Sequence, residues 1–343
     1  MKGIVCDRAG LLEWRDDLPE PEPGPGEAIV RIRRVGICGT DYHAFAGRQP
    51  FFTYPRILGH ELSGTIEWID GNEAGLSPGD TVSIIPYLHC GTCIACRQGK
   101  TNCCMHLRVM GVHVDGGLRE FVSVPVTHLV KTEGLSFDQA AMLEPLAIGA
   151  HAVRRSGAAE GRTVLVIGAG PIGLGVMVFA RLAGARVLAM DISGRRLSFC
   201  RSWAGVEQLI DANGLKAPQI TSRLSELTEG EFPSIVFDAT GNAGSMTDAF
   251  GYLAHGGTLV YVGLTQGGIT FSHPEFHKRE TTLLASRNAT REDFERVLQA
   301  VKSGHIDIGR YITHRARHDD MIERFIHWTR PETGVIKAVV EWP

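Results

Sequence analysis

The order of apolar and polar positions predicts that the first part of the chain is rich in β-strands. Residues 27–39 (EAIVRIRRVGICG) alternate between apolar and polar side chains and end in a glycine turn, as a half-buried strand does. Residues 79–87 (GDTVSIIPY) form a second strand-like run after a turn, and the proline-rich residues 19–27 predict a loop. Since no helical pattern is prominent before about residue 137, we expect residues 1–150 to be mostly strands and loops.

A helix is predicted to begin at about Phe137, in the segment SFDQAAMLEPLAIGAHAV. Ser136 can cap its first turn, and Asp138 places a negative charge where the helix dipole favours one. From Arg162 onward, short apolar strands alternate with helical segments, which predicts a parallel, doubly wound sheet. The strands are predicted at 163–170, 185–193, 234–241 and 256–264, the helices between them at 171–184 and 194–205, and a last helix and strand at 291–304 and 334–343.

Composition and charge narrow the possible functions. The 343-residue length predicts two domains. The 35 lysines and arginines nearly balance 38 acidic residues without a basic block, which disfavours a nucleic-acid partner. Charges at Asp7 and Arg8 interrupt the N-terminal apolar segment before it reaches the length of a signal-peptide core. The longest apolar run, 164–180, is short of a membrane span. We therefore expect a cytoplasmic protein without a membrane partner, in which clustered cysteines bind metal rather than form disulfides.

Five of the eight cysteines lie within residues 89–104 (HCGTCIACRQGKTNCC). Cys90, Cys93 and Cys96 have the spacing C-x2-C-x2-C, and either Cys103 or Cys104 can supply a fourth thiolate. Four thiolates on one short loop suit a tetrahedral zinc ion with no open position, which is a structural site. Clustered free thiols are the alternative, but they would be prone to oxidation.

A second group of possible metal ligands is scattered over three segments. CGTDYH contributes Cys38, Thr40, Asp41 and His43, GHE contributes His60 and Glu61, and EPLAIGAH contributes Glu144. Thiolate, imidazole and carboxylate groups together could supply the three ligands of a catalytic zinc ion with an open position. Each residue also has a structural interpretation: Cys38 as a buried apolar side chain, His60 as a turn residue and Glu144 as a surface carboxylate.

The segment GAGPIG indicates a dinucleotide-binding site. Gly168, Gly170 and Gly173 have the G-x-G-x-x-G spacing, follow a predicted strand and open a predicted helix, with Pro171 and Ile172 between the last two glycines. Asp191, 21 residues after Gly170, is placed to accept the ribose hydroxyls and to repel a 2′-phosphate, which favours NAD over NADP. Arg195 and Arg196 follow closely and argue in the other direction. The predicted cofactor-binding residues are Gly168, Gly170, Pro171, Ile172, Gly173, Asp191, Arg196 and Gly263.

Five motifs occur in an order and at distances that resemble the zinc-containing medium-chain alcohol dehydrogenase family, in its polyol and threonine dehydrogenase branch. They are CGTDYH, GHE, the four-cysteine loop, EPLAIGAHA and VLVIGAGPIGLG, and the resemblance extends over essentially the whole chain. It implies a split GroES-like β-barrel domain (1–150 and 286–343) with two zinc sites, a Rossmann NAD-binding domain (151–285), and a homodimer or homotetramer. The implied activity is NAD- and zinc-dependent oxidation of an alcohol.

The resemblance also assigns roles to residues. Cys38, His60 and Glu144 match the ligands of the catalytic zinc, and Cys90, Cys93, Cys96 and Cys104 match those of the structural zinc, which leaves Cys103 over. Glu61 resembles an alternate or outer ligand, and Asp41 matches the carboxylate that orients the zinc-bound histidine. Thr40 and His43 match a proton relay to solvent, although His43 could also be structural.

The segments AGRQPFF, GVHVDGG, HPEFHKRETT and SRNAT resemble bacterial dehydrogenases of L-galactonate, L-gulonate and related sugar acids. We therefore expect oxidation of a secondary hydroxyl of a sugar acid, with Arg48, Arg287 and Asn288 as candidates to bind its carboxylate or hydroxyl groups. L-Threonine or a polyol such as sorbitol is the first alternative substrate. A non-enzymatic, zinc-stabilised protein that senses NAD is the second alternative. Lys337 is interpreted as an exposed strand residue, and His89, His113 and His151 as structural.

Overall fold

The computed structural model describes residues 1–71 and 75–343. The chain divides into two compact units. The split unit comprises Met1–Pro145 and Thr290–Pro343, and the middle unit comprises Leu146–Ala289.

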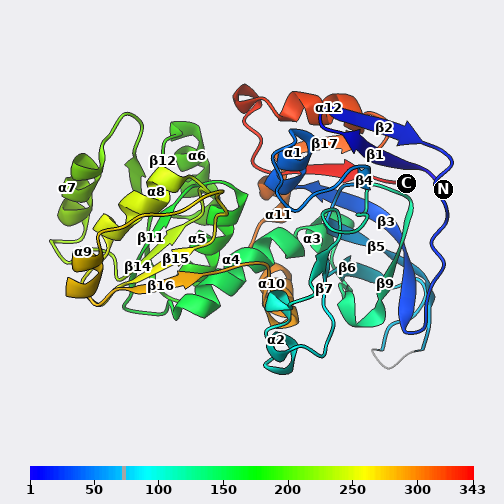
Figure 1. Cartoon of the computed structure of the whole chain (residues 1–343), viewed down its shortest axis with the longest axis horizontal. Helices are drawn as coiled ribbons and strands as arrows, with labels where there is room; N and C mark the ends of the chain where they lie inside the picture. Colours follow the sequence, from blue (N-terminus) through cyan, green and yellow to red (C-terminus); the bar gives the residue numbers. More distant parts are fainter. Residues whose placement is uncertain (72–74) are drawn as a thin grey trace. The chain divides into compact units, whose positions relative to one another are not determined.

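The two ends of the chain meet in the main sheet of the split unit. Its strands have the order β10-β6-β5-β3-β18-β17, and β9 also pairs with β3. β3 (Glu27–Ile37) has alternating buried and half-buried side chains, as its sequence predicts. β18 (Ala338–Glu341) pairs antiparallel with β3, so the red C-terminal strand lies beside a blue N-terminal strand in Figure 1. The N-terminal and C-terminal segments therefore form one core.

The remaining strands of the split unit in the described ranges are β1 (Gly3–Arg8), β2 (Leu11–Arg15), β4 (Arg56–Ile57), β5 (Glu61–Ile69), β6 (Thr81–Ile84), β7 (Tyr87–Leu88), β8 (Arg108–Val109), β9 (Phe121–Pro125), β10 (Leu129–Lys131) and β17 (His314–Arg317). Its helices there are α1 (Gly39–Phe45), α2 (Ile94–Arg97), η1 (Thr101–Cys103), η2 (Val126–His128), α3 (Phe137–Ala141), α10 (Arg291–Lys302), α11 (Ile308–Tyr311), α12 (Met321–Trp328) and η5 (Pro331–Thr333).

The helix predicted from Phe137 starts as expected but is divided. The hydroxyl oxygen of Ser136 accepts a hydrogen bond from the backbone N–H of Gln139 (3.2 Å) and so caps α3. α3 ends at Ala141, and α4 (Leu143–Ser156) begins after Met142 and continues into the middle unit. Pro145 has no N–H to donate to the preceding turn, so it fits the first turn of a new helix but not the interior of a longer one.

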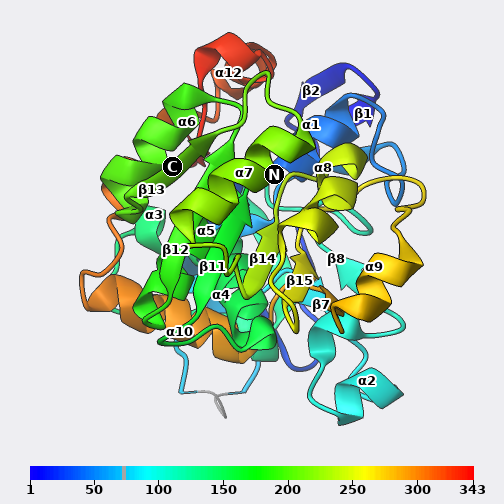
Figure 2. The same cartoon turned by 90° about the vertical axis from the view of Figure 1, so that its left-hand side faces the viewer.

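The middle unit is a parallel sheet with the strand order β13-β12-β11-β14-β15-β16. Every adjacent pair in it is parallel, and Figure 2 shows β12, β11, β14 and β15 next to one another. This is the doubly wound order in which a dinucleotide binds at the carboxyl ends of the strands. The strands are β11 (Thr163–Ile167), β12 (Arg186–Asp191), β13 (Gln208–Asp211), β14 (Ile235–Asp238), β15 (Thr258–Tyr261) and β16 (Thr282–Ala285). The predicted fold class is confirmed.

The helices of the middle unit follow its strands in sequence. They are α5 (Pro171–Leu182), α6 (Gly194–Phe199), η3 (Cys200–Ala204), α7 (Ala217–Leu227), α8 (Ala243–Asp248), η4 (Ala249–Tyr252) and α9 (His273–Lys278). Apolar side chains on one face of the sheet pack against α7 and η4 and form a core cluster whose residues differ from those of the split unit's core. Among the described residues, no helix combines the length and the apolar character needed to cross a membrane.

Candidate functional site

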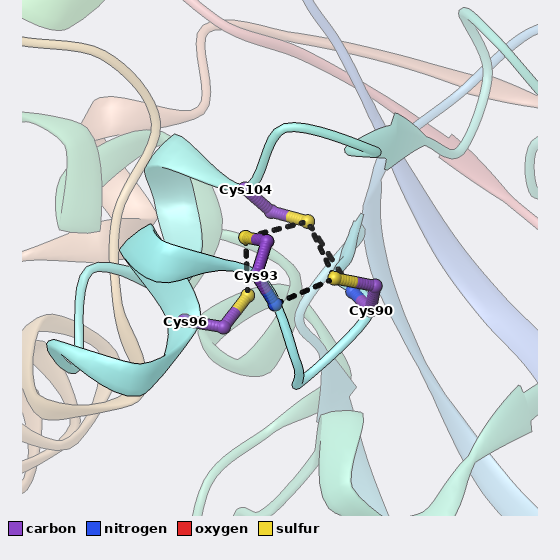
Figure 3. A group of neighbouring side chains, drawn as sticks. All are labelled: Cys90, Cys93, Cys96 and Cys104. Carbon is purple, nitrogen blue, oxygen red and sulfur yellow. Dashed lines mark hydrogen bonds between the residues drawn. The ribbon is translucent and has the colours of Figure 1, made fainter.

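The four-cysteine loop lies between β7 and β8, and its thiols converge. The sulfur atoms of Cys90, Cys93, Cys96 and Cys104 lie within 4.8 Å of one another, and Figure 3 shows them pointing toward a common centre. The Sγ–Sγ distances are 3.5 Å for Cys93–Cys96, 3.9 Å for Cys93–Cys104 and 3.5 Å for Cys90–Cys104. Zn–S bonds of about 2.3 Å imply sulfur separations of about 3.8 Å in a tetrahedron. The cluster fits a structural zinc ion, and Cys103 is an exposed thiol outside it.

A second donor group lies where α1 and β5 begin. Cys38 precedes α1, and His60 and Glu61 lie at the start of β5. Donor atoms of Cys38, His60 and Glu61 lie within 4.8 Å of one another. His60 and Glu61 are buried, whereas Cys38 is half-buried. The structure therefore brings together a thiol, an imidazole and a carboxylate, which are the ligand types of a catalytic zinc site.

Glu144 is close to this group but is not one of its members. It lies in α4, is 1% exposed, and its Oε1 accepts a hydrogen bond from the hydroxyl of Tyr87. Its Oε2 has no hydrogen-bond partner within residues 1–71 and 75–343. Burial raises the pKa of Glu144 to about 7, and His60 opposes that rise. The role of Glu144 as a zinc ligand therefore stays a prediction, and Glu61 is the carboxylate that the geometry groups with Cys38 and His60.

The carboxylate of Asp41 accepts hydrogen bonds from the backbone on both sides of the donor group. It is fully buried, and its Oδ2 accepts a hydrogen bond from the N–H of Cys38 (2.8 Å). Its Oδ1 accepts one from the N–H of Gly59 (3.3 Å) and lies 3.8 Å from Nδ1 of His60. Asp41 thus holds the residues on both sides of the site, and its carboxylate lies near the imidazole as predicted, beyond hydrogen-bonding distance.

The interpretation of Lys337 as an exposed strand residue is wrong. Lys337 immediately precedes β18, is 2% exposed, and its Nζ lies 2.6 Å from Oε1 of Glu61 and 3.3 Å from the carbonyl oxygen of Ile37. The apolar residues around it in GVIKAVV are core residues of the sheet, so the lysine between them is buried as well. The only signal in the sequence is a single charge in an apolar run, and its partner is 276 positions away.

The electrostatics of the donor group favour a positive charge. Burial alone would lower the pKa of His60, but Asp41 and Cys38 outweigh it and hold that pKa well above its usual value. Nδ1 of His60, Oε2 of Glu61 and Oε2 of Glu144 are buried without a hydrogen-bond partner among the residues that the structure describes. Buried polar atoms normally have partners. A cation bound between these groups would supply them, so the residues present fit a zinc ion.

The residues predicted to relay a proton lie on α1, beside the donor group. Thr40 is half-buried in the first turn, and His43 is in the last turn of this helix. Burial and the positive charge of Arg48 both lower the pKa of His43, which favours its neutral, proton-accepting form. Arg48 is exposed, and its backbone N–H donates to the carbonyl oxygen of His43 (2.8 Å).

The glycine-rich segment has the geometry of a nucleotide-binding turn. Gly168 has φ +96°, and Gly170 precedes α5, in which Pro171 and Ile172 form the first turn. A Cβ on Gly173 would lie 1.7 Å from the carbonyl oxygen of Gly168, so only glycine fits there. A Cβ on Gly170 would meet no atom within 4 Å, which leaves open space beside the N-terminus of α5. An anion such as a pyrophosphate can bind in that position.

The other predicted cofactor residues of the middle unit have different environments. Asp191 is 7% exposed, and its carboxylate accepts hydrogen bonds from the N–H of Ala169 (2.6 Å) and of Ser193 (2.8 Å). It therefore ties the glycine-rich turn to the end of β12. Arg196 is exposed on α6. A Cβ on Gly263 would lie 2.3 Å from the backbone nitrogen of Gly241. The close packing of these two loops therefore explains the glycine at this position without a cofactor.

The predicted substrate residues do not all belong to one unit. Arg48 lies in the split unit, whereas Arg287 and Asn288 follow β16 in the middle unit. Arg287 is exposed. Asn288 has φ +51°, and its Nδ2 is buried without a partner in the described part of the chain. Asparagine tolerates this left-handed conformation, and its buried donor is available to a ligand.

The three histidines predicted to be structural each contact a neighbouring group. Nδ1 of His113 accepts a hydrogen bond from the N–H of Val109 (3.1 Å), and His151 is 8% exposed on α4. His89 packs on His128, with ring centroids 4.7 Å apart. Nε2 of His128 lies 3.1 Å from Nδ1 of His89 and 3.2 Å from the carbonyl oxygen of Tyr87. A carbonyl oxygen only accepts, so Nε2 of His128 carries a proton.

His128 is expected to make folding stability depend on pH. Burial lowers its pKa to about 4 from the ordinary value of 6.5, and His89 acts in the same direction. The unfolded chain therefore binds this proton at a higher pH than the folded chain does. Stability should fall as the pH drops from about 6.5 to about 4, by at most about 3 kcal/mol from this residue.

Urea unfolding of wild type and His128→Gln at pH 7 and pH 4.5 tests this. The glutamine can still donate to the carbonyl of Tyr87 but does not titrate. The wild type should lose more stability than the variant over this interval, and equal losses would contradict the assignment.

Fold and donor groups together define a zinc protein with a dinucleotide-binding fold. Residues 24–134 match the family described as Alcohol dehydrogenase GroES-like domain, and residues 171–303 match Zinc-binding dehydrogenase. L-Galactonate-5-dehydrogenase of Escherichia coli K12 is 42% identical over 99% of this chain and 98% of its own length. L-Threonine 3-dehydrogenase of Rhizobium etli CIAT 652 is 30% identical over 100% of this chain and 99% of its own.

A solved structure agrees with these sequence matches. The crystal structure of a short chain alcohol dehydrogenase from Escherichia coli CFT073, complexed with NADH, has a TM-score of 0.90 and 27% identity. It covers 100% of this chain and 99% of that one. The chain belongs to the zinc-binding alcohol dehydrogenase family and is an oxidoreductase of that family. The predicted family and enzyme class are confirmed, and zinc and a nicotinamide dinucleotide are the cofactors of such enzymes.

Proposed function

We propose that this protein oxidises a secondary hydroxyl group of a sugar acid to a ketone, with L-galactonate as substrate, C5 as the reacting carbon and NAD as hydride acceptor. The observation that carries the chemistry is the group formed by Cys38, His60 and Glu61, which are three donors of the types that bind zinc and whose surrounding charges favour a cation. The 42% identity to L-galactonate-5-dehydrogenase supports the substrate.

The chain's own residues would hold the metal and the reacting hydroxyl. Cys38 and His60 are the fixed ligands in this proposal, with Glu144 as the third and Glu61 as the alternate carboxylate. Lys337 donates to Oε1 of Glu61, and Oε2 has no partner among the described residues, so Oε2 is the oxygen that Glu61 could offer to a metal. A zinc ion bound here supplies Lewis acidity, which lowers the pKa of a hydroxyl group that reaches it by several units.

Removal of the hydroxyl proton is assigned to Thr40 and His43. His43 is held neutral by its partial burial and by Arg48, so it can accept a proton near pH 7. Because it lies in the last turn of α1 and is partly exposed, it can pass that proton to water.

Arg48, Arg287 and Asn288 are proposed to bind the carboxylate and hydroxyl groups of the substrate, since guanidinium and amide donors suit both.

The pyrophosphate of the cofactor is assigned to the turn formed by Gly168, Gly170 and Gly173 together with Pro171 and Ile172, and the adenosine ribose to Asp191. Arg196 and Gly263 complete the proposed cofactor site. A carboxylate at the end of β12 favours the ribose hydroxyls of NAD and disfavours the 2′-phosphate of NADP. NAD supplies the chemistry of hydride acceptance.

Replacing Asp191 with asparagine should weaken the preference for NAD. The amide oxygen can still accept the hydrogen bond from Ala169, whereas the amide nitrogen cannot accept the one from Ser193. The turn therefore keeps one of its two hydrogen bonds to this side chain, and the repulsion of a 2′-phosphate is lost. The ratio of kcat/KM with NAD to kcat/KM with NADP should fall about tenfold or more, which corresponds to about 1.4 kcal/mol. An unchanged ratio in D191N would show that Asp191 does not select the cofactor.

The substrate proposal is tested by a panel of alcohols with NAD. Initial rates of NADH formation are measured with L-galactonate, L-gulonate, sorbitol and L-threonine, and the product of the best substrate is identified by NMR. The proposal predicts the highest kcat/KM with a sugar acid and a ketone at C5. If neither sugar acid reduces NAD while L-threonine or sorbitol does, the substrate assignment is wrong and the family assignment stands.

Oxidation of L-threonine is a second candidate function, which the 30% identity over the full chain to L-threonine 3-dehydrogenase favours. The same panel of alcohols distinguishes a sugar acid dehydrogenase from an L-threonine dehydrogenase.

A cytoplasmic location, a homodimeric or homotetrameric state and the absence of nucleic-acid or membrane partners remain predictions from the sequence. Size-exclusion chromatography with light scattering measures the oligomeric state.

A further inference from the structure

Tyr87 links the base of the four-cysteine loop to Glu144. It lies on β7, which pairs antiparallel with β8 through Tyr87↔Val109 and Leu88↔Arg108. These two short strands enclose the loop that carries the four zinc-binding thiols. Cys90 follows Tyr87 by three positions, so the loop is joined directly to the strand that carries Tyr87.

The side chain of Tyr87 extends from this base into the core of the split unit. It is 3% exposed, and its ring packs edge-on against Phe294, with ring centroids 6.4 Å apart and an interplanar angle of 72°. Its hydroxyl donates to Oε1 of Glu144. Because this bond occupies Oε1, Oε2 is the oxygen of Glu144 that is left for another ligand.

The backbone of Tyr87 is also held in place on both sides. Nε2 of His128 lies 3.2 Å from the carbonyl oxygen of Tyr87. The preceding carbonyl, of Pro86, accepts from the N–H of Met110 (3.0 Å), and the N–H of Ile85 donates to the carbonyl oxygen of His128 (2.8 Å). These contacts fix the backbone from which the side chain of Tyr87 reaches Glu144.

We propose that Tyr87 is a positioning residue through which the four-cysteine loop determines which oxygen of Glu144 is available to the catalytic zinc. The proposal rests on the proposed function, because it concerns the same catalytic site. In this account, a zinc ion in the loop does more than stabilise the fold. The four thiols would hold the loop closed around that ion, which would fix β7, and the hydroxyl of Tyr87 would orient Glu144.

Tyr87→Phe tests the contribution of the hydroxyl, because the variant keeps the ring and its packing on Phe294. Outer residues that orient metal ligands typically contribute about 10- to 100-fold to activity. We expect kcat to fall by about that factor, with KM for NAD unchanged and two zinc ions per chain retained. Cobalt in place of the catalytic zinc has a visible spectrum that depends on ligand geometry, and Y87F should change it. Tyr252→Phe, which removes a hydroxyl from the core of the middle unit, is the matched control and should change neither property.

The link to the loop is tested by combining variants. Cys93→Ser removes one thiol of the cluster and should change the cobalt spectrum of the catalytic site in the same direction as Y87F. The double variant C93S/Y87F should show no further change, because both substitutions release the same carboxylate. If C93S does not fold, Arg97→Ala takes its place, since it removes the hydrogen bond from Arg97 to the carbonyl oxygen of Thr92 inside the loop and leaves the thiols intact.

The outcomes separate this proposal from the proposed function. Wild-type kcat and an unchanged cobalt spectrum in Y87F would overturn the positioning role of Tyr87. Additive effects of the loop variant and Y87F would overturn the link to the loop. If the wild type oxidised none of the tested alcohols, the proposed function would fail, but the cobalt spectrum of Y87F would still show whether Tyr87 orients Glu144.

Discussion

Replacing Cys38 with serine is expected to abolish dehydrogenase activity while leaving the fold intact. Cys38 is half-buried and precedes α1, and serine has nearly the same shape, so the helix should still form. Serine is a much poorer zinc ligand than a thiolate, so the catalytic site should lose its metal. Loss of a Lewis acid removes several kcal/mol of transition-state stabilisation, and we expect kcat/KM to fall by at least about 10³-fold.

Metal analysis makes this prediction specific. The wild type should contain two zinc ions per chain, and C38S should contain one, bound to the four-thiol cluster. Cys103→Ser is the matched control, because Cys103 is an exposed thiol outside both donor groups. It should retain both zinc ions and full activity. Full activity in C38S would rule out a catalytic metal bound by Cys38.

Replacing Lys337 with methionine is expected to cause a large loss of folding stability. Lys337 and Glu61 are 2% and 0% exposed, and their charged atoms lie 2.6 Å apart. Removing one partner of a buried ion pair leaves an uncompensated charge, at a cost of about 3–5 kcal/mol. Urea unfolding should show that loss in K337M.

Two further variants show whether the unpaired charge is the cause. The double variant K337M/E61Q should recover part of the stability, because it removes the charge that was left without a partner. Lys131→Met breaks a surface ion pair, in which Nζ lies 2.9 Å from Oδ2 of Asp80, and should cost less than about 1 kcal/mol. A K337M variant as stable as K131M would mean that Glu61 finds another partner or takes up a proton.

The sequence predicted best those features that repeat or lie close together along the chain. The alternating strand at 27–39, the cap at Ser136 and the parallel sheet after Arg162 each depend on local patterns. The four-thiol cluster was also accessible, because its ligands lie on one loop. Its fourth ligand needed either a resemblance or the structure, since spacing alone does not separate Cys103 from Cys104.

Features that depend on distant contacts were harder to predict. Lys337 pairs with a residue 276 positions earlier, and only the pairing of β18 with β3 brings the two together. The hydrogen bond from Tyr87 to Glu144 joins residues 57 positions apart and likewise has no local signal. The sequence could identify Glu144 and Glu61 as possible ligands, but only the folded chain shows that Glu61 is grouped with Cys38 and His60.

In the proposed reaction, hydride passes directly from C5 of a sugar acid to NAD. The most direct measurement uses L-galactonate labelled with deuterium at C5, followed by analysis of the reduced cofactor by mass spectrometry and NMR. We predict one deuterium atom in each reduced cofactor and a ketone at C5 of the product. Reduced cofactor without deuterium, or no turnover of this substrate, would contradict the claim.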